Sequence, residues 1–250
     1  MPLIHFKMNL VVDVGNTLVK FAVFQESVLI HKETFILSDF KKNLEKIEGD
    51  FPKIKNAILG VVGSFSIKNV ERLEKLFNLY VITNATKVPF VNDYTTPKTL
   101  GFDRIALASA ACKLFPNKNV LIIDVGTCIT YDFMDSKMHF KGGAISPGIT
   151  MRYKALHTFT EKLPLLDANT PKTILGNSTA TSIHSGVMYG VSFEIDGVIN
   201  RYKEEFKDLT VILTGGNAHF LRDSLKNSIF ANSNFLLEGL NYLLEYNQNT

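Results

Sequence analysis

Apolar residues recur along the chain with two different spacings. Short runs rich in Val, Ile, Leu and Phe, such as residues 10–12 and 57–62, alternate with stretches in which apolar residues return every three or four positions, such as residues 67–77. The first spacing is typical of buried strands and the second of amphipathic helices. Because the two kinds of stretch alternate, the pattern predicts an α/β fold rather than an all-β one.

The first half is predicted to contain strands, three helices and one polar, proline-containing loop. The strands are expected as a pair over residues 9–24 and singly over 27–35, 57–62 and 79–83, the helices from Ser38 or Asp39 to Lys46, over 66–78 and over 105–114, and the loop over 92–100.

The second half is predicted to repeat this alternation. Two glycines, a proline and a further glycine within residues 141–148 are expected to form a tightly turned loop. Gly186, Gly190 and Gly197 recur at about one helical turn, which indicates close packing against a neighbour. The other expected elements are a strand pair over 120–135, helices over 150–160, 181–205 and 235–246, a loop over 163–172, a strand over 209–213 and a glycine turn over 214–218.

The predicted strand pair at residues 9–24 carries the first candidate chemistry. Its two strands are separated by a short turn with the sequence DVGNT, which begins at Asp13. A glycine lets a backbone approach a phosphate closely, free N–H groups can face the anion, and a carboxylate can hold Mg²⁺ directly or through water. The alternative is a surface hairpin in which Asp13 and Asn16 only shape the turn.

The same arrangement recurs in the second half. The strand pair at residues 120–135 encloses the turn DVGT, which begins at Asp124, close to half the chain length after Asp13. A duplicated strand–turn–strand unit at this spacing suggests two related domains that face each other across a nucleotide. The boundary is expected near residues 116–119, so the predicted domains are residues 1–116 and 117–250.

Composition narrows the classes of function. A hydrophobic content of 46% is ordinary for a globular protein, and the net charge of +3, without a long basic run, favours neither nucleic acid nor membrane as a partner. The two cysteines have no metal-binding spacing and suit a reducing compartment. No signal peptide or membrane span is recognised, so we expect a cytoplasmic protein in which residues 1–7 are an extension. We find no metal-ligand motif among the histidines, no P-loop and no GxSxG elbow.

Five groups of residues, in this order, resemble the motifs of the type III pantothenate kinase family, within the actin, Hsp70 and sugar kinase superfamily of ATP-dependent phosphotransferases. The resemblance covers the chain from Met8 to its end. The groups are DVGNT at 13–17, Tyr94 with Pro97 and GFDR at 101–104, DVGT at 124–127, GGAISPG at 142–148, and Gly176 with Thr179, Ser185 and Gly186.

The resemblance implies a fold, an activity and partners. The fold would be two similar ribonuclease H-like (actin-like) α/β domains facing each other across a nucleotide cleft. The activity would be phosphorylation of pantothenate to 4′-phosphopantothenate by ATP with Mg²⁺, the first step of coenzyme A biosynthesis. A monovalent cation, K⁺ or NH₄⁺, would activate the enzyme, and the family's homodimer would place the substrate sites near its interface.

The resemblance also implies roles for residues at matching positions. Asp13 would lie near Mg²⁺, Asp103 would be the general base for the pantothenate hydroxyl, and Asp124 would bind the monovalent cation. The residues expected to bind ATP are Asp13, Val14, Gly15, Asn16, Thr17, Leu18, Val19, Lys20 and Thr127. Those expected to bind pantothenate are Tyr94, Gly101, Phe102, Asp103, Arg104 and Thr179.

Three departures from the family pattern stand out, and two other functions stay open. Cys128 replaces a usual Ala, residues 61–63 read VVG where relatives often have Ser-Val-Pro, and the residues before Thr179 match loosely. One alternative is a kinase of another small hydroxylated acceptor. The other is a non-enzymatic ATP-binding regulator on the same fold, which the retention of Asp13, Asp103 and Asp124 argues against.

Overall fold

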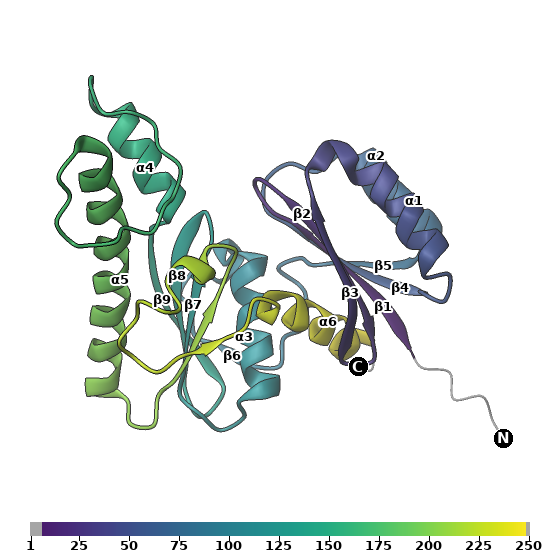
Figure 1. Cartoon of the computed structure of the whole chain (residues 1–250). Coiled ribbons are helices and arrows are strands. Elements are labelled where there is room, and N and C mark those ends of the chain that lie inside the picture. The colour runs from purple at the N-terminus through teal and green to yellow at the C-terminus, as the bar shows by residue number, and fades with distance from the viewer. Residues whose placement is uncertain (1–6, 249–250) are drawn as a thin grey trace. The chain divides into compact units, whose positions relative to one another are not determined.

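The computed structural model describes residues 7–248, which form two compact units. The first unit contains the chain up to Leu114 together with the stretch from Phe235 onward, and the second runs from Phe115 to Asn234. Figure 1 traces the chain by colour. The predicted N-terminal extension, residues 1–7, lies outside the described residues except for Lys7. Within residues 7–248, no helix is long and apolar enough to cross a bilayer.

The first unit is an α/β unit whose strands and helices lie close to the predicted positions. Its strands are β1 (Met8–Val14), β2 (Val19–Gln25), β3 (Val28–Phe35), β4 (Asn56–Val61), β5 (Asn78–Val81) and the short β6 (Val91–Asn92), its α-helices are α1 (Phe40–Asp50), α2 (Ile67–Leu76), α3 (Phe102–Leu114) and α6 (Phe235–Gln248), and its 3-10 turns are η1 (Leu37–Asp39) and η2 (Pro97–Thr99).

The alternation of side chains along β1 separates the two faces of the sheet in the first unit. The strands run in the order β3-β2-β1-β4-β5, with β1, β2 and β3 antiparallel and β1, β4 and β5 parallel. Leu10, Val12 and Val14 pack into a core that α1 and α2 cover (Figure 1). Successive side chains of a strand point to opposite faces, so Asn9 and Asp13 share the other face.

The C-terminal helix α6 belongs to the first unit, which differs from the predicted boundary of the second domain. The buried Asn9 side chain on β1 donates to Asn241 of α6 at 2.8 Å, and Asn241 donates to the backbone oxygen of Glu26 at 3.0 Å. Lys113 of α3 bonds Glu245 of α6 at 3.4 Å. A buried amide needs a partner, and here the partner comes from the far end of the chain. Sequence position alone could not indicate this pairing.

The second unit repeats the strand topology of the first. Its order β11-β10-β7-β8-β9 again joins a three-stranded antiparallel meander to two parallel strands. This correspondence supports the duplication inferred from the two DxG turns. The elements are β7 (Val120–Val125), β8 (Cys128–Met134), β9 (His139–Pro147), β10 (Thr210–Thr214), β11 (Phe230–Ala231), α4 (Ile149–Thr158), α5 (Thr179–Glu205) and the 3-10 turn η3 (Ala218–Phe220).

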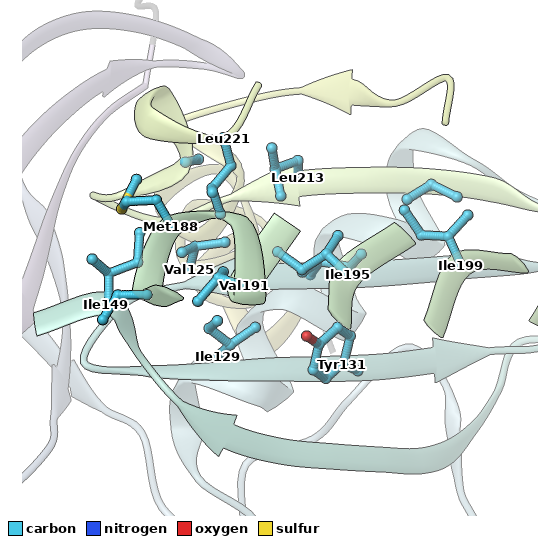
Figure 2. Packing of buried hydrophobic residues seen from close by; sticks show 14 of the residues in the cluster. Val125, Ile129, Tyr131, Ile149, Met188, Val191, Ile195, Ile199, Leu213 and Leu221 are labelled. Atoms are coloured by element: carbon cyan, nitrogen blue, oxygen red, sulfur yellow. The ribbon is translucent and has the colours of Figure 1, made fainter. Parts of the chain in front are cut away.

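A single apolar core joins the sheet of the second unit to α4 and α5. Figure 2 shows Val125 and Ile129 of the strands beneath Val191 and Ile195 of α5. Each of these four side chains is fully buried. Because Val125 ends β7 and Ile129 is the second residue of β8, this core fixes both ends of the turn that contains the second candidate motif.

Two expectations for the second half are wrong. Residues 141–148 were expected to form a loop, but β9 continues through Pro147 and pairs with β8. The pairing shifts after Phe133, and Gly142 adopts φ +91°, so the glycine accommodates a bulge instead of a turn. The packing predicted for the glycines of α5 is also not found within the described chain, since a Cβ at Gly186, Gly190 or Gly197 would meet nothing within 4 Å.

Candidate functional site

Asp13 is the penultimate residue of β1 and forms an ion pair across the first hairpin. Its carboxylate accepts from the Lys20 ammonium at 2.9 Å, and the two residues are direct partners in the β1–β2 register. Asp13 is only 4% exposed, whereas the turn residues Asn16 and Thr17 are exposed. The buried carboxylate therefore has a compensating cation, and the turn beside it is open to a ligand.

Asp103 occupies the first turn of α3, in the same unit as Asp13. Its Oδ1 accepts from the Arg104 backbone N–H at 2.8 Å, as an acidic side chain at a helix N-terminus commonly does. Burial raises the pKa of the Asp103 carboxyl, the hydrogen bond from Arg104 opposes that rise, and the nearby Asp13 carboxylate adds to it. Gly101 leaves room for this carboxylate, since a Cβ there would overlap Asp103 Oδ1.

Arg104 and Tyr94 form a second pair in the first unit. The Arg104 guanidinium lies 5.2 Å from the centre of the Tyr94 ring and donates to the Tyr94 hydroxyl at 3.4 Å. Arg104 is only 6% exposed, although it carries a permanent charge. The structure thus brings together the Tyr94, Asp103 and Arg104 positions that the sequence singled out, at the start of α3 and in the loop before it.

Asp124 is the penultimate residue of β7, at the position in the second unit that Asp13 has in the first. The residue opposite it on β8 is Thr130, so no lysine faces it across the hairpin as Lys20 faces Asp13. Gly215 follows β10 with φ +97°, and a Cβ there would overlap Asp124 Oδ1. A glycine at this position allows the loop after β10 to lie against the Asp124 carboxylate.

The loop after β10 also holds the second hairpin turn. The Asn217 backbone N–H donates to Val125 O at 3.0 Å, and its side chain donates to Gly126 O at 3.4 Å. From the other side, the Gly148 N–H donates to Thr127 O at 3.2 Å. Thr127 is exposed on this braced turn. The glycine turn expected over residues 214–218 therefore follows β10, and the structure places it against the hairpin turn that follows Asp124.

Thr179 is the first residue of α5, and its side chain is exposed. The preceding Ser178 caps the helix, because its side chain accepts from the Thr181 backbone N–H at 3.2 Å, and Thr181 completes a capping box. No bond within the described residues ties Thr179 to the braced hairpin of the second unit. Its place at a helix start is thus explained by local capping.

The sequence reasoning missed a polar cluster in the second unit. Arg152 of α4 donates to Glu194 of α5 at 2.5 Å and to Ser146 of β9 at 3.0 Å. Tyr131 of β8 donates to the same Glu194 at 2.8 Å. Burial raises the pKa of the Tyr131 hydroxyl, and the bond to Glu194 raises it further. Their hydrogen bonds link α4 and α5 to strands β8 and β9. Because the residues are far apart in sequence, no local sequence pattern predicts this cluster.

The donor atoms bear on the type of metal that the chain could hold. Within residues 7–248, no group of three or more His, Cys, Asp or Glu side chains is arranged around a common point. A single carboxylate such as Asp13 is nevertheless an ordinary Mg²⁺ ligand when phosphate and water oxygens complete the coordination sphere. The residues present therefore fit a metal that arrives with a nucleotide.

Known proteins are similar to this chain over most of its length. A model of the family described as type III pantothenate kinase matches residues 9–201. A type III pantothenate kinase of Christiangramia forsetii is 49% identical over 241 residues, which cover 96% of this chain and 99% of that protein.

Among solved structures, a protein described as a Baf family transcriptional activator from Campylobacter jejuni is 20% identical, with a TM-score of 0.64 over 96% of this chain and all of that one. A glucokinase from an Antarctic psychrotroph is 16% identical, with a TM-score of 0.53 over 96% of this chain and 99% of that one. These two likenesses show the fold alone and confirm the expected α/β class of the sugar kinases.

Proposed function

The chain belongs to the type III pantothenate kinase family, and on this premise we propose that it phosphorylates pantothenate with ATP to give 4′-phosphopantothenate and ADP, the first step of coenzyme A biosynthesis. The primary hydroxyl oxygen of pantothenate forms a bond to the γ-phosphorus. The bond from that phosphorus to the β,γ-bridging oxygen breaks, and the electron pair leaves with ADP. The hydroxyl proton passes to a carboxylate of the enzyme.

The observation that carries this proposal is the pair of carboxylates in the first unit. Asp103 is half-buried, and desolvation, together with the charge of the nearby Asp13, raises the pKa of the Asp103 carboxyl. A carboxylate with a raised pKa is a stronger base and is better matched to removing an alcohol proton near neutral pH. We assign Asp103 as this base, with its position fixed by the first turn of α3.

Asp13 and Lys20 would handle the phosphates and Mg²⁺. Mg²⁺ supplied with ATP would neutralise charge on the transferring phosphoryl group. Asp13 would hold the metal directly or through water, and Lys20 would turn its ammonium from Asp13 toward a phosphate oxygen. The exposed backbone of residues 15–18 would approach the same phosphates, with the side chains of Val14 and Val19 packed into the core at either end.

The acceptor would lie at the start of α3. Arg104 offers a planar fork of donors that suits the pantothenate carboxylate, and its contact with Tyr94 fixes the plane of that fork. Gly101 and Phe102 would line the acceptor beside Asp103. Arg104 would bind the carboxylate of pantothenate and Asp103 its primary hydroxyl. Together these two contacts would explain how the enzyme selects pantothenate.

The second unit would contribute Thr127 to ATP and Asp124 to a monovalent cation, K⁺ or NH₄⁺. The half-buried Asp124 carboxylate is a hard oxygen ligand next to the turn assigned to the nucleotide. Thr179, exposed at the start of α5, would be a further pantothenate contact. Replacing K⁺ with Na⁺ should lower turnover in the wild type and change it less in Asp124→Asn.

A homodimer is also part of the proposal. Gly186, Phe193 and Gly197 lie exposed on one side of α5, and Phe193 keeps 53% of its surface accessible. Phe159 and Leu175, 85% and 81% exposed, add apolar area in the same unit. An apolar helix face with glycines can receive a second helix closely, and a symmetric copy of α5 fits this face. Light scattering should give a dimer for the wild type and a monomer for Phe193→Asp.

The direct test is ADP release from the purified protein with ATP, Mg²⁺ and K⁺, with and without pantothenate. We expect turnover only when pantothenate is present, and a product with the mass of 4′-phosphopantothenate. Turnover that appears only with other small hydroxylated acceptors would support a different kinase instead. Nucleotide binding without turnover on any acceptor would support the non-enzymatic regulator.

A further inference from the structure

Gly60 of β4 lies beside Asp13 in the sheet of the first unit. The two residues are direct partners in the parallel β1–β4 register. Partnered residues of neighbouring strands point to the same face of a sheet, so the missing side chain of Gly60 leaves a gap next to the Asp13 carboxylate. The Phe102 ring fills this gap, because a Cβ at Gly60 would overlap the edge of that ring.

Phe102 is the first residue of α3, immediately before Asp103. Its ring on the surface of β4 therefore decides how closely the start of the helix approaches the sheet. We propose that Gly60 is a positioning residue: its missing side chain seats Phe102 against β4 and so sets the separation between the Asp103 and Asp13 carboxylates. This inference rests on the proposed role of Asp103 as the base.

The surroundings of Phe102 indicate that a larger residue at position 60 would move the ring without unfolding the unit. Phe102, together with Val61, Leu100 and Ile105, lines a cavity of about 200 Å³. A displaced ring can shift into this space. The first turn of α3 would move with it and carry Asp103 away from its place beside Asp13.

The test is a double-mutant cycle that combines Gly60→Ala with Phe102→Leu. Gly60→Ala should lower kcat by about 10- to 100-fold, the scale expected when a catalytic group is misplaced by about 1 Å, while the KM for ATP stays within about threefold. In the Phe102→Leu background, where no ring meets the new methyl group, the same change should cost less than about threefold. Gly49→Ala on α1 is the matched control, because its Cβ would meet nothing within 4 Å, and it should leave kcat unchanged.

The split between kcat and the KM for ATP, together with the smaller loss expected in the Phe102→Leu background, supplies a readout that a purely structural role would not change. If Gly60→Ala does not fold, Phe102→Leu alone serves, and it should lower kcat because the start of α3 loses its seat. Unchanged kcat in the folded Gly60→Ala protein, or an equal loss in both backgrounds, overturns the inference, as does unchanged kcat in Phe102→Leu when it must serve alone.

Asp103→Asn separates this inference from the proposed function. If that variant keeps wild-type turnover, Asp103 is not the base and both proposals fail. If it is inactive while Gly60→Ala retains full turnover, Asp103 keeps its role and only the positioning role of Gly60 is lost.

Discussion

The two hairpins, β1–β2 and β7–β8, start from the same DVG sequence and differ in their turns. The first turn spans residues 15–18, three of which are exposed, and it closes on itself through a bond from Gly15 N–H to Leu18 O at 3.0 Å. The second spans only 126–127 and is held from two sides, by the loop after β10 and by the start of α4. The first hairpin is also supported at its end, because the Val62 N–H after β4 donates to Val14 O at 2.8 Å, as the Asn217 N–H donates to Val125 O. The same strand topology therefore supports a longer, exposed turn and a shorter, more firmly braced turn.

The charges next to the turns differ as well. Asp13 is paired with Lys20, whereas the cross-strand partner of Asp124 is Thr130. A lysine that can leave its carboxylate for a phosphate suits the hairpin near the transferring group. The second turn is held in place and has a carboxylate, Asp124, with no lysine opposite it. This arrangement suits binding of the monovalent cation better than contact with the transferring phosphate. We propose that the repeated strand topology serves as a common scaffold on which the two turns have different roles.

Matched substitutions of the two aspartates should give the largest difference. Asp13→Asn removes the proposed Mg²⁺ ligand and leaves Lys20 without its carboxylate, so kcat should fall by roughly 100- to 1000-fold. Asp124→Asn should lower kcat only about tenfold at saturating K⁺, because the braced turn stays in place. Steady-state kinetics of both variants measures these changes. Equal losses of kcat would contradict the different roles assigned to Asp13 and Asp124.

Substitution of Gly215 tests the bracing of the second turn. Gly215→Ala places a Cβ at φ +97° and against Asp124, and the left-handed backbone alone costs about 1–2 kcal/mol. The KM for ATP should rise about tenfold, the change that corresponds to about 1.4 kcal/mol. Gly216→Ala is the control, since its Cβ would meet nothing within 4 Å. Similar effects of the two changes would show that the contact with Asp124 is unimportant.

The pH dependence of activity should reflect the raised pKa of Asp103 in the first unit. Asp103 must be ionised to act as the base, and its pKa is raised by burial and by Asp13. Activity should therefore decline as pH falls through a value above the ordinary Asp pKa of about 4. A profile of kcat/KM for pantothenate between pH 4 and pH 8, a range chosen around that value, measures this limb. A limb at or below the ordinary value would contradict the assigned environment.

The contact between α6 and β1 in the first unit should affect the stability of the protein more than its activity. Asn241→Ala leaves the buried Asn9 amide without its acceptor, which typically costs about 1–3 kcal/mol. The melting temperature should fall by several degrees, with kcat within about twofold of the wild type. Lys42→Ala, at an exposed position on α1, should change stability by less than about 0.5 kcal/mol. Equal shifts of the melting temperature in the two variants would show that the bond between Asn9 and Asn241 does not stabilise the first unit.

Local patterns predicted most of the fold and of the candidate site. Both hairpins and most helices follow from local spacing, because short-range sequence determines turns and helix starts, whereas the grouping of Tyr94 with Arg104 was implied by the family resemblance. The strand β9 was missed because its glycines read as a turn, although the pairing with β8 makes them a bulge. Glycine content alone does not distinguish these two conformations.

Long-range contacts account for what could not be predicted. The placement of α6 with the first unit involves contacts between distant parts of the chain, such as the bond between Asn9 and Asn241 and the close approach of Gly239 to Ala106. The Gly60–Phe102 contact likewise joins a strand to a helix that begins many residues later. Such contacts leave no periodic trace in the sequence. They matter for the site because they fix the distances between groups that the motifs only identify.

The most direct test of Asp103 as the general base is to measure both the turnover and the melting temperature of the Asp103→Asn variant. The variant should lose pantothenate-dependent turnover by at least about 100-fold, as expected when a general base is removed. Because the raised pKa means that the folded protein binds this proton more tightly than the unfolded chain, ionised Asp103 destabilises the fold at pH 7, and the neutral amide should raise the melting temperature. Wild-type turnover in the folded variant, or a loss of turnover explained by a lower melting temperature, would contradict the assignment.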